Sequence, residues 1–346
     1  MNETIAIDEI TGPFEPHARG LGRFGTLLAG IGICMCIVLV IAIVGDTQKI
    51  RDSWDAFRWD SLILIGFLAV VNQGLRYWRW EILLKKVAPS VSIKRFTSMI
   101  AFGAGSLLIF TPARIGEVAK SIYARRFFGI PVSKSVSILI AERLADLVVM
   151  ALLAILGLLL LGDFSHLVIA LSLFLSAVAL FIIWGLSVKW GIITRIMHKC
   201  LGSKLDQVIQ LVSSSQRLIL TPRIVGINLL LGGISWLIEV LIYFLSLSAI
   251  GISTDLHLFV IALAVFPLAS LGGSLSFLPG GLGATEGGLV ALGILLGGLS
   301  EETALMASLV SRAAILGVVV LAGFASMFLL NKVAFGSEHG ECDDPG

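Results

Sequence analysis

Charged side chains are scarce in this sequence, in which Asp, Glu, Lys and Arg together make up 14% of 346 residues. An ordinary soluble domain carries about 25% charged residues, so this chain has too few of them to cover a surface in water. Hydrophobic residues make up 57% of it, and the mean hydropathy is +0.99. The composition therefore excludes a soluble protein and indicates that the chain lies in a lipid bilayer.

The sequence also lacks the motifs of metal sites and hydrolytic enzymes. Its four cysteines show no C-x-x-C spacing, its five histidines show no metal-ligand spacing, and there is no Walker, H-E-x-x-H or G-x-S-x-G motif. We expect no metal, no cofactor and no catalytic residue. The small net charge of +2 gives no indication of nucleic acid as a partner, and the sequence leaves a homodimer open.

Long apolar runs fill most of the chain. A membrane-spanning helix needs about 20 mostly apolar residues. Runs of this length predict six spans, at roughly 25–44, 59–84, 137–161, 166–187, 223–249 and 303–330. The remaining segments are a polar N-terminal tail (1–24), an amphipathic linker helix (188–222) and a disordered acidic tail (332–346). The predicted fold class is an all-α polytopic membrane protein.

Two more apolar segments, about 96–124 and 256–297, are interrupted by proline and glycine. The first contains P-A-R-I-G-E at 112–117, and the second contains L-P-G-G-L-G-A-T-E at 278–286. In each segment the part after the proline is too short to cross the bilayer comfortably. We predict two re-entrant hairpins of half-helices, although a pair of tilted full spans stays open for 256–297.

The basic residues predict the orientation of these segments. The connections 162–165, 250–256 and 298–302 carry no Lys or Arg, and most basic residues lie in the connections on the opposite side. Because Lys and Arg favour the cytosolic side, we expect both termini in the cytosol and the protein in the cell inner membrane. The first hairpin then enters from the cytosol and the second from outside, as in an inverted repeat.

Corresponding residues support two repeated membrane halves, 25–187 and 223–331. Five pairs of positions recur at a spacing of 167 or 169 residues: Pro112 and Pro279, Gly116 and Gly283, Glu117 and Glu286, Arg143 and Arg312, and Asn72 and Glu239. Broken segments at matching places in two inverted halves are typical of transporters whose substrate site lies near the middle of the bilayer.

Several ionisable residues lie at predicted membrane depth, where each costs about 2.5–3.5 kcal/mol on insertion scales. They are Glu117, Glu142, Arg143, Asp146, Glu239, Glu286 and Arg312. We expect them to face a protein interior or a watery cavity and to pair with one another. Near the predicted cytosolic end of its helix, Arg79 is expected to snorkel to the surface, with Trp78 and Trp80 in the interfacial belt.

The half-helices expected to begin at Pro112 and Pro279 predict an anion site. Free N–H groups and the dipole at a helix N-terminus favour a phosphate, and Arg114 would make one side positive. The predicted substrate-binding residues are Pro112, Arg114, Gly116, Glu117, Arg143, Pro279, Gly280, Gly281, Gly283, Glu286 and Arg312. Structural ion pairs, Glu117–Arg143 and Glu286–Arg312, are an alternative, and proton coupling is a third.

A second polar group is predicted at the middle of the membrane, comprising Glu239, Asn72, Arg76 and Asp146. Glu239 has no basic neighbour in its own segment. Three alternatives stay open for it: an ion pair with Arg76 across the bundle, a proton carrier, or a neutral, hydrogen-bonded carboxyl group.

The ordered motifs P-A-R-I-G-E (112–117), A-E-R-L-A-D (141–146), L-P-G-G-L-G-A-T-E (278–286) and S-R (311–312) resemble the lysylphosphatidylglycerol synthase transmembrane-region family. The resemblance covers about residues 20–330. In that family the membrane region resembles a flippase for aminoacylated phosphatidylglycerol, attached in some members to a soluble aminoacyl-transferase domain. The resemblance implies the flipping part here, and we expect no aminoacyl-transferase domain.

These observations favour a non-enzymatic flippase or transporter that moves a phospholipid or another lipid-linked anionic substrate, such as a polyprenyl-linked sugar. A membrane glycosyltransferase using a polyprenyl-phosphate sugar is an alternative, although such enzymes commonly need an acidic residue on a substantial external loop. An ion-coupled transporter of a small solute is another, because it uses the same repeat.

Overall fold

The computed structural model describes residues 58–111, 116–162, 165–169, 171–175 and 221–336, which all belong to one compact unit. Within these ranges the secondary structure is helical, without strands. The predicted span 25–44, most of the span 166–187, the N-terminal tail, nearly all of the linker and most of the acidic tail lie outside the described residues.

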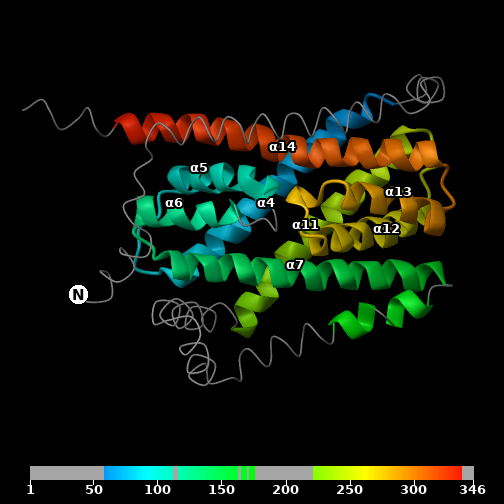
Figure 1. The fold of residues 1–346 in the computed structure, drawn as a ribbon, viewed down its shortest axis with the longest axis horizontal. Coiled ribbons are helices and arrows are strands. Elements are labelled where there is room, and N and C mark those ends of the chain that lie inside the picture. Colours follow the sequence, from blue (N-terminus) through cyan, green and yellow to red (C-terminus); the bar gives the residue numbers. More distant parts are fainter. Residues whose placement is uncertain (1–57, 112–115, 163–164, 170, 176–220, 337–346) are drawn as a thin grey trace, which may run out of the picture. The chain divides into compact units, whose positions relative to one another are not determined.

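The described helices form two series with the same order of elements (Figure 1). The first series is α4 (Ser61–Val87), α5 (Arg95–Ser106), the 3-10 turn η1 (Leu107–Phe110), α6 (Ala119–Phe128) and α7 (Val132–Leu161). The second is α11 (Pro222–Ala249), α12 (Leu256–Leu275), the 3-10 turn η3 (Pro279–Gly281), α13 (Ala284–Gly297) and α14 (Glu301–Gly336).

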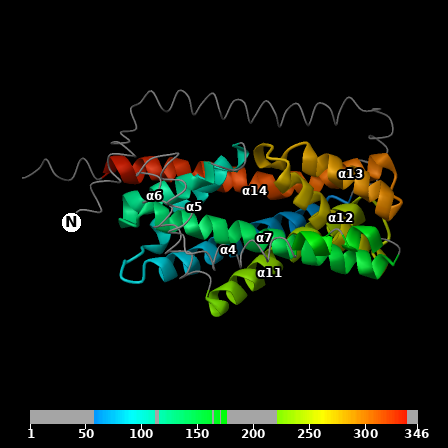
Figure 2. The ribbon, with the colours of Figure 1, turned by 60° about the horizontal axis from the view of Figure 1, so that its bottom comes forward.

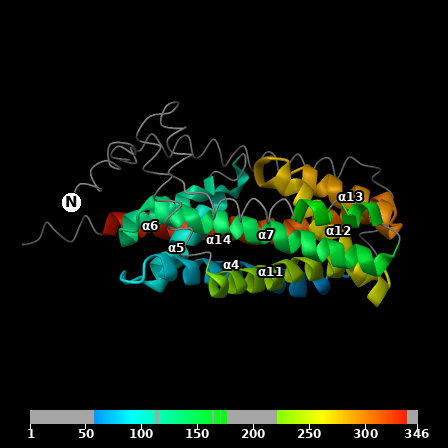
Figure 3. The ribbon, with the colours of Figure 1, turned by 90° about the horizontal axis from the view of Figure 1, so that it is seen from below.

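Corresponding helices of the two series run in opposite directions. Figure 1 shows α7 and α14 as long antiparallel helices, and Figure 3 shows the same opposition between α4 and α11. The order and direction of the elements thus agree with the predicted inverted repeat.

Six described stretches are long and apolar enough to cross a membrane, which confirms the predicted fold class. They are Ser61–Val87, Lys134–Leu161, Pro222–Ala249, Leu256–Leu275, Pro279–Gly297 and Glu301–Leu330. The region 256–297 therefore contains two such stretches, whereas α5 with η1 and α6 are shorter. Whether either broken segment turns back within the bilayer stays a prediction.

Outward-facing side chains of these helices are apolar. On α4, Ile63 and Phe67 are 80% and 62% exposed, and Leu321 and Phe328 on α14 are similarly exposed. A water-soluble helix packs such residues inward, whereas a helix in a bilayer turns them towards lipid. The exposed faces therefore agree with a multi-pass membrane location.

Glycines allow the closest approaches between helices. A Cβ atom on Gly157 of α7 would lie 2.7 Å from the Cα atom of Ala264 on α12. A Cβ atom on Gly103 of α5 would overlap Ser326 on α14, and Figure 2 shows α5 alongside α14. Small residues at such crossings are typical of membrane helix packing, which depends on close van der Waals contact.

The two breaks in the helices meet inside the bundle. A Cβ atom on Gly280 of η3 would lie 3.1 Å from the Phe110 ring of η1. Gly280 and Gly281 have φ angles of 61° and 69°, a left-handed conformation that glycine adopts without steric cost. The turn can therefore bring its backbone close to the other half of the repeat.

Candidate functional site

A polar cavity lies between the two series of helices, with a volume of about 80 Å³. At roughly 10–15 Å³ for each water molecule, it has room for several waters. Its charged lining consists of Arg76, Arg79, Glu117, Lys120, Glu142, Arg143, Glu239 and Arg312. This space, called the central cavity below, contains most of the ionisable residues predicted at membrane depth.

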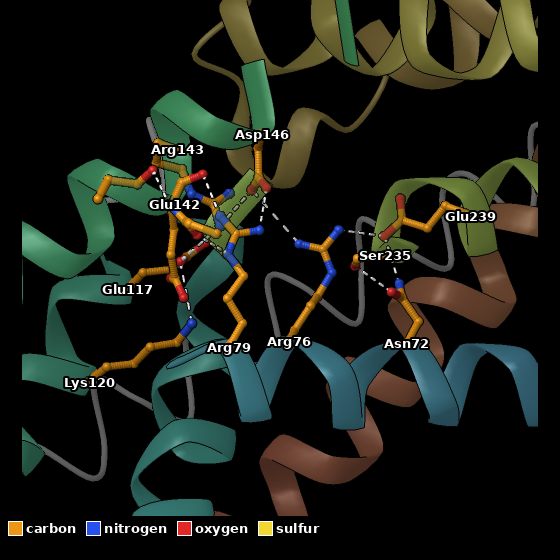
Figure 4. A network of polar contacts seen from close by, with 12 residues as sticks. Asn72, Arg76, Arg79, Glu117, Lys120, Glu142, Arg143, Asp146, Ser235 and Glu239 are labelled. Atoms are coloured by element: carbon orange, nitrogen blue, oxygen red, sulfur yellow. Dashed lines mark hydrogen bonds and ion pairs between the residues drawn. The ribbon is translucent and has the colours of Figure 1, made fainter. Parts of the chain in front are cut away.

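The Glu239 carboxylate on α11 is bound by two side chains of α4 (Figure 4). Its Oε1 atom accepts a 2.8 Å hydrogen bond from Asn72 Nδ2 and a 2.6 Å hydrogen bond from Arg76 Nη2. Ser235 donates to Asn72 Oδ1, and the Arg76 guanidinium lies 5.5 Å from the centre of the Trp236 ring. The pairing of Glu239 with Arg76, one of the three alternatives for this residue, is therefore present.

Arg79 makes the most extensive contacts in the cavity wall. It donates to Asp146 Oδ1 at 2.7 Å, to Asn228 Oδ1 at 2.6 Å and to the main-chain oxygen of Glu142 at 2.7 Å. The prediction that Arg79 snorkels to the surface is wrong, because three acceptors on α7 and α11 bind it inside the bundle. Its side chain is only 3% exposed.

The prediction that Trp80 lies in an interfacial belt is also wrong. It is buried and packs with Leu84 and Ile138 in a core between α4 and α7. Trp78, by contrast, is 55% exposed, as expected. The two tryptophans lie two residues apart and so face different sides of α4, and the inner side is covered by α7.

Arg143 lies at the junction of two acidic side chains. Its Nη2 atom is 3.3 Å from Asp146 Oδ2 and 3.8 Å from Glu117 Oε2. Glu117 has a nearer cation in Lys120, at 3.4 Å. The predicted Glu117–Arg143 pair is therefore present but shared.

Lys120 was missed as a site residue because a basic residue near the cytosolic side is expected to lie at the surface. It is buried, and its Nζ atom lies 4.4 Å from the centre of the Phe102 ring. The spacing of three residues from Glu117 was the signal that could have found it, since such residues share one helix face.

In the second half, Glu286 and Arg312 secure the broken segment. Arg312 donates to Glu286 Oε1 at 2.7 Å and to the main-chain oxygen of Gly280 at 3.0 Å. Glu286 Oε2 accepts from the Gly283 N–H at 2.7 Å. The predicted Glu286–Arg312 pair is present, and it joins α14 to the turn before α13.

The start of the second half-helix differs from the prediction. Pro279 lies in η3, and α13 begins only at Ala284, after Gly283. The side chain of Glu286 reaches back to the cap of its own helix, as in a capping box. An N–H group expected to meet a phosphate is therefore already bound.

In the first half, Pro112 and Arg114 lie outside the described residues. Gly116 is described, and its N–H donates to Thr111 Oγ1 at 2.6 Å. A binding role for these residues, and for Pro279, Gly281 and Gly283, stays a prediction. Among the described residues, no group of three His, Cys, Asp or Glu side chains is arranged to hold a metal ion.

A second hollow of about 230 Å³ adjoins the central cavity and shares Arg143, Trp236 and Ser274 with it. Its other walls are mostly apolar and include Met150 on α7 and Leu278 before η3. Arg143 therefore borders a polar space on one side and an apolar space on the other.

Comparison with known proteins assigns the chain to a family. Its residues 27–323 match the model of the lysylphosphatidylglycerol synthase TM region. It is also 26% identical over 314 residues to a protein of Methanothermobacter thermautotrophicus named "UPF0104 membrane protein", with 83% of this chain and 90% of that one covered. The family match includes both broken segments and every described residue of the central cavity. The chain therefore belongs to the lysylphosphatidylglycerol synthase transmembrane-region family.

Proposed function

We propose that this protein moves a phospholipid, or another lipid-linked anionic substrate, between the two leaflets of the membrane. The observation that carries the proposal is the position of Arg143 between the polar central cavity and the apolar hollow. A phosphodiester joined to acyl chains has the same two parts. The family assignment, to the membrane region of a lipid-modifying protein, supports the same substrate class.

The cavity wall also offers free hydrogen-bonding groups. Arg143 Nε, Trp236 Nε1, Ser106 Oγ and Ser270 Oγ are buried without a hydrogen-bond partner among the described residues, and all four side chains line the central cavity. Buried polar groups are usually satisfied, so unpaired donors around a polar cavity suit a polar ligand that binds there. Arginine in particular suits a phosphate, because its guanidinium forms charge-assisted hydrogen bonds.

The proposed movement needs no covalent chemistry. The headgroup would cross through the central cavity while the acyl chains stay in the bilayer. Two halves with opposite direction can alternate access by rocking against each other around a fixed site. We propose the orientation with both termini in the cytosol, which places the start of α4 outside and its end inside.

The test uses purified protein in vesicles that contain phosphatidylglycerol labelled on its headgroup. An impermeant quencher added outside should remove the inner-leaflet signal faster with protein than without it. Arg143→Gln should slow this loss at least several-fold, whereas Lys86→Gln, an exposed lysine at the end of α4, should leave it unchanged.

The proposal is wrong if labelled phosphatidylglycerol, phosphatidylethanolamine and polyprenyl phosphate all lose signal equally with and without protein. Uptake of a water-soluble solute by the same vesicles would then indicate the alternative small-solute transporter. Formation of a new glycoside from an added polyprenyl-phosphate sugar would indicate the glycosyltransferase.

A further inference from the structure

Most carboxylates around the central cavity are already paired. The pairs are Glu239 with Arg76 at 2.6 Å, Asp146 with Arg79 at 2.7 Å, Glu117 with Lys120 at 3.4 Å, and Glu286 with Arg312 at 2.7 Å. Among the described residues, one acid and one base of the cavity wall, Glu142 and Arg143, lie outside these pairs.

Glu142 is a buried carboxylate without a partner of its own. It is 5% exposed and lines the central cavity, and among the described residues its carboxylate has no hydrogen bond or ion pair. Only its main-chain oxygen is bound, by Arg79. An unpaired charge in such a place is costly, so this carboxylate is the one in the cavity wall that a proton can neutralise without breaking an ion pair.

The charged groups that face Glu142 come from three helices. They are Arg79 on α4, Lys120 on α6, and Arg143 and Asp146 on α7. From α11 the nearby polar group is the amide of Asn228, which donates to the main-chain oxygen of Ala141. The packed helix α12 contains no Asp, Glu, Lys or Arg.

Arg143 is the matching surplus cation. Its two acidic neighbours have closer partners, since Asp146 is 2.7 Å from Arg79 and Glu117 is 3.4 Å from Lys120. Its side chain is 34% exposed, more than that of any other base of the cavity wall, so it is the base best placed to meet an incoming anion.

We propose that Glu142 binds one proton for each phosphodiester that binds at Arg143, so that transport of an anionic headgroup is electroneutral and proton-coupled. Among the described residues, the five bases and three acids of the cavity wall, together with Asp146 and Glu286, which pair with two of those bases, then carry no net charge. An entering phosphodiester adds one negative charge, and protonation of the Glu142 carboxylate removes one. The proton leaves with the headgroup on the other side, and no bond of the lipid changes.

Glu239 is less suited to this role. Both its hydrogen-bond donors approach the same oxygen, and one of them is the Arg76 guanidinium. In the described part of the chain, protonation of Glu239 would leave Arg76 with a more distant acid, Asp146 at 4.0 Å. Protonation of Glu142 separates no such pair.

The inference rests on the proposed lipid transport, and its test uses the same vesicles with an imposed pH gradient or a potassium-diffusion potential. With labelled phosphatidylglycerol, an acidic interior should speed the loss of inner-leaflet label several-fold, whereas a potential of either sign should change it little. Glu142→Gln should still move the lipid without a gradient but should lose the acceleration by the pH gradient.

Two variants keep the test decisive. Glu142→Asp retains a titratable group and should keep part of the response, provided that it elutes as a single species like the wild type. Glu301→Gln, an exposed acid in the first turn of α14, should keep all of it.

Three results would overturn the inference while leaving lipid transport standing. The first is transport by the wild type at a rate that does not depend on the pH gradient, and the second is a full pH response in Glu142→Gln. The third is a Glu142→Gln variant in which only the preference between phosphatidylethanolamine and phosphatidylglycerol changes. The last would mean that Glu142 binds a headgroup amine. Absence of any lipid movement by the wild type would instead reject the proposed function, and this inference with it.

Discussion

Asn72 and Glu239, which occupy equivalent positions 167 residues apart in the two halves, are joined by a 2.8 Å hydrogen bond. Residues related by a two-fold pseudo-symmetry can contact each other only where both lie near its axis. This contact therefore places the axis of the repeat beside the central cavity. Evolution from two identical halves would have put the same residue at both positions, and the pair now differs in charge.

The Glu239 contacts predict a stability effect. Glu239→Gln leaves Arg76 without its nearest acid, and breaking one side of a buried ion pair typically costs about 3–5 kcal/mol. We expect a clearly lower midpoint of thermal unfolding in detergent. The double variant Arg76→Gln with Glu239→Gln should recover part of the loss. A single variant as stable as the wild type would contradict a structural role for this pair.

The ion pair between Glu286 and Arg312 predicts an effect on the yield of folded protein, because it holds the turn before α13 in place. Neutralising Arg312 removes the hydrogen bond from α14 to the main-chain oxygen of Gly280, and neutralising Glu286 removes the bond to the Gly283 N–H. Either change also breaks the ion pair between Glu286 and Arg312. We expect a lower yield of folded protein for each single variant, measured by size-exclusion chromatography, and partial recovery when the two charges are exchanged. Normal yield with abolished lipid movement would place the pair in the substrate path instead.

The sequence was informative where spacing alone carries the signal. Equal separations of prolines, glycines and charges predicted the repeat, because a repeated fold places equivalent residues in equivalent surroundings. They also offered Glu286–Arg312 as an ion pair, whereas the pairing of Glu239 with Arg76 was one of three alternatives. The hydrophobic runs predicted α4, α7, α11 and α14 to within six residues of their bounds, because each must reach across the same bilayer thickness.

The sequence was less informative about which basic residues turn inward. Arg79 and Lys120 lie near predicted cytosolic ends, and a rule that counts Lys and Arg cannot distinguish a surface residue from a buried one. Their burial depends on acceptors far along the chain, such as Asn228, 149 residues from Arg79. The later start of α13 could have been predicted from the sequence, since G-A-T-E at 283–286 has the acid three residues after the cap position.

Glycine substitutions test the helix crossings. Gly157→Ala places a methyl group against the backbone of Ala264, and backbone cannot move aside as a flexible side chain can. We expect a loss of stability of several degrees in the unfolding midpoint. Gly66→Ala is the matched control, because a Cβ atom there meets nothing within 4 Å and alanine favours a helix by about 1 kcal/mol. Equal midpoints for the two variants would contradict the close packing of α7 on α12.

The orientation of the two halves is tested by cysteine labelling in a variant whose four native cysteines are replaced by serine. Single cysteines at the exposed positions Ser253 and Ser300 should react with an impermeant thiol reagent added to intact cells. A cysteine at Ser90, in the exposed connection between α4 and α5, should react only after permeabilisation. The reason is that the connections before α12 and before α14 carry no basic residue, whereas Lys85 and Lys86 lie beside Ser90. Labelling of Ser90 and Ser300 from the same side would be incompatible with α4 and α14 as full spans in the proposed order, and would remove the basis for alternating access between inverted halves.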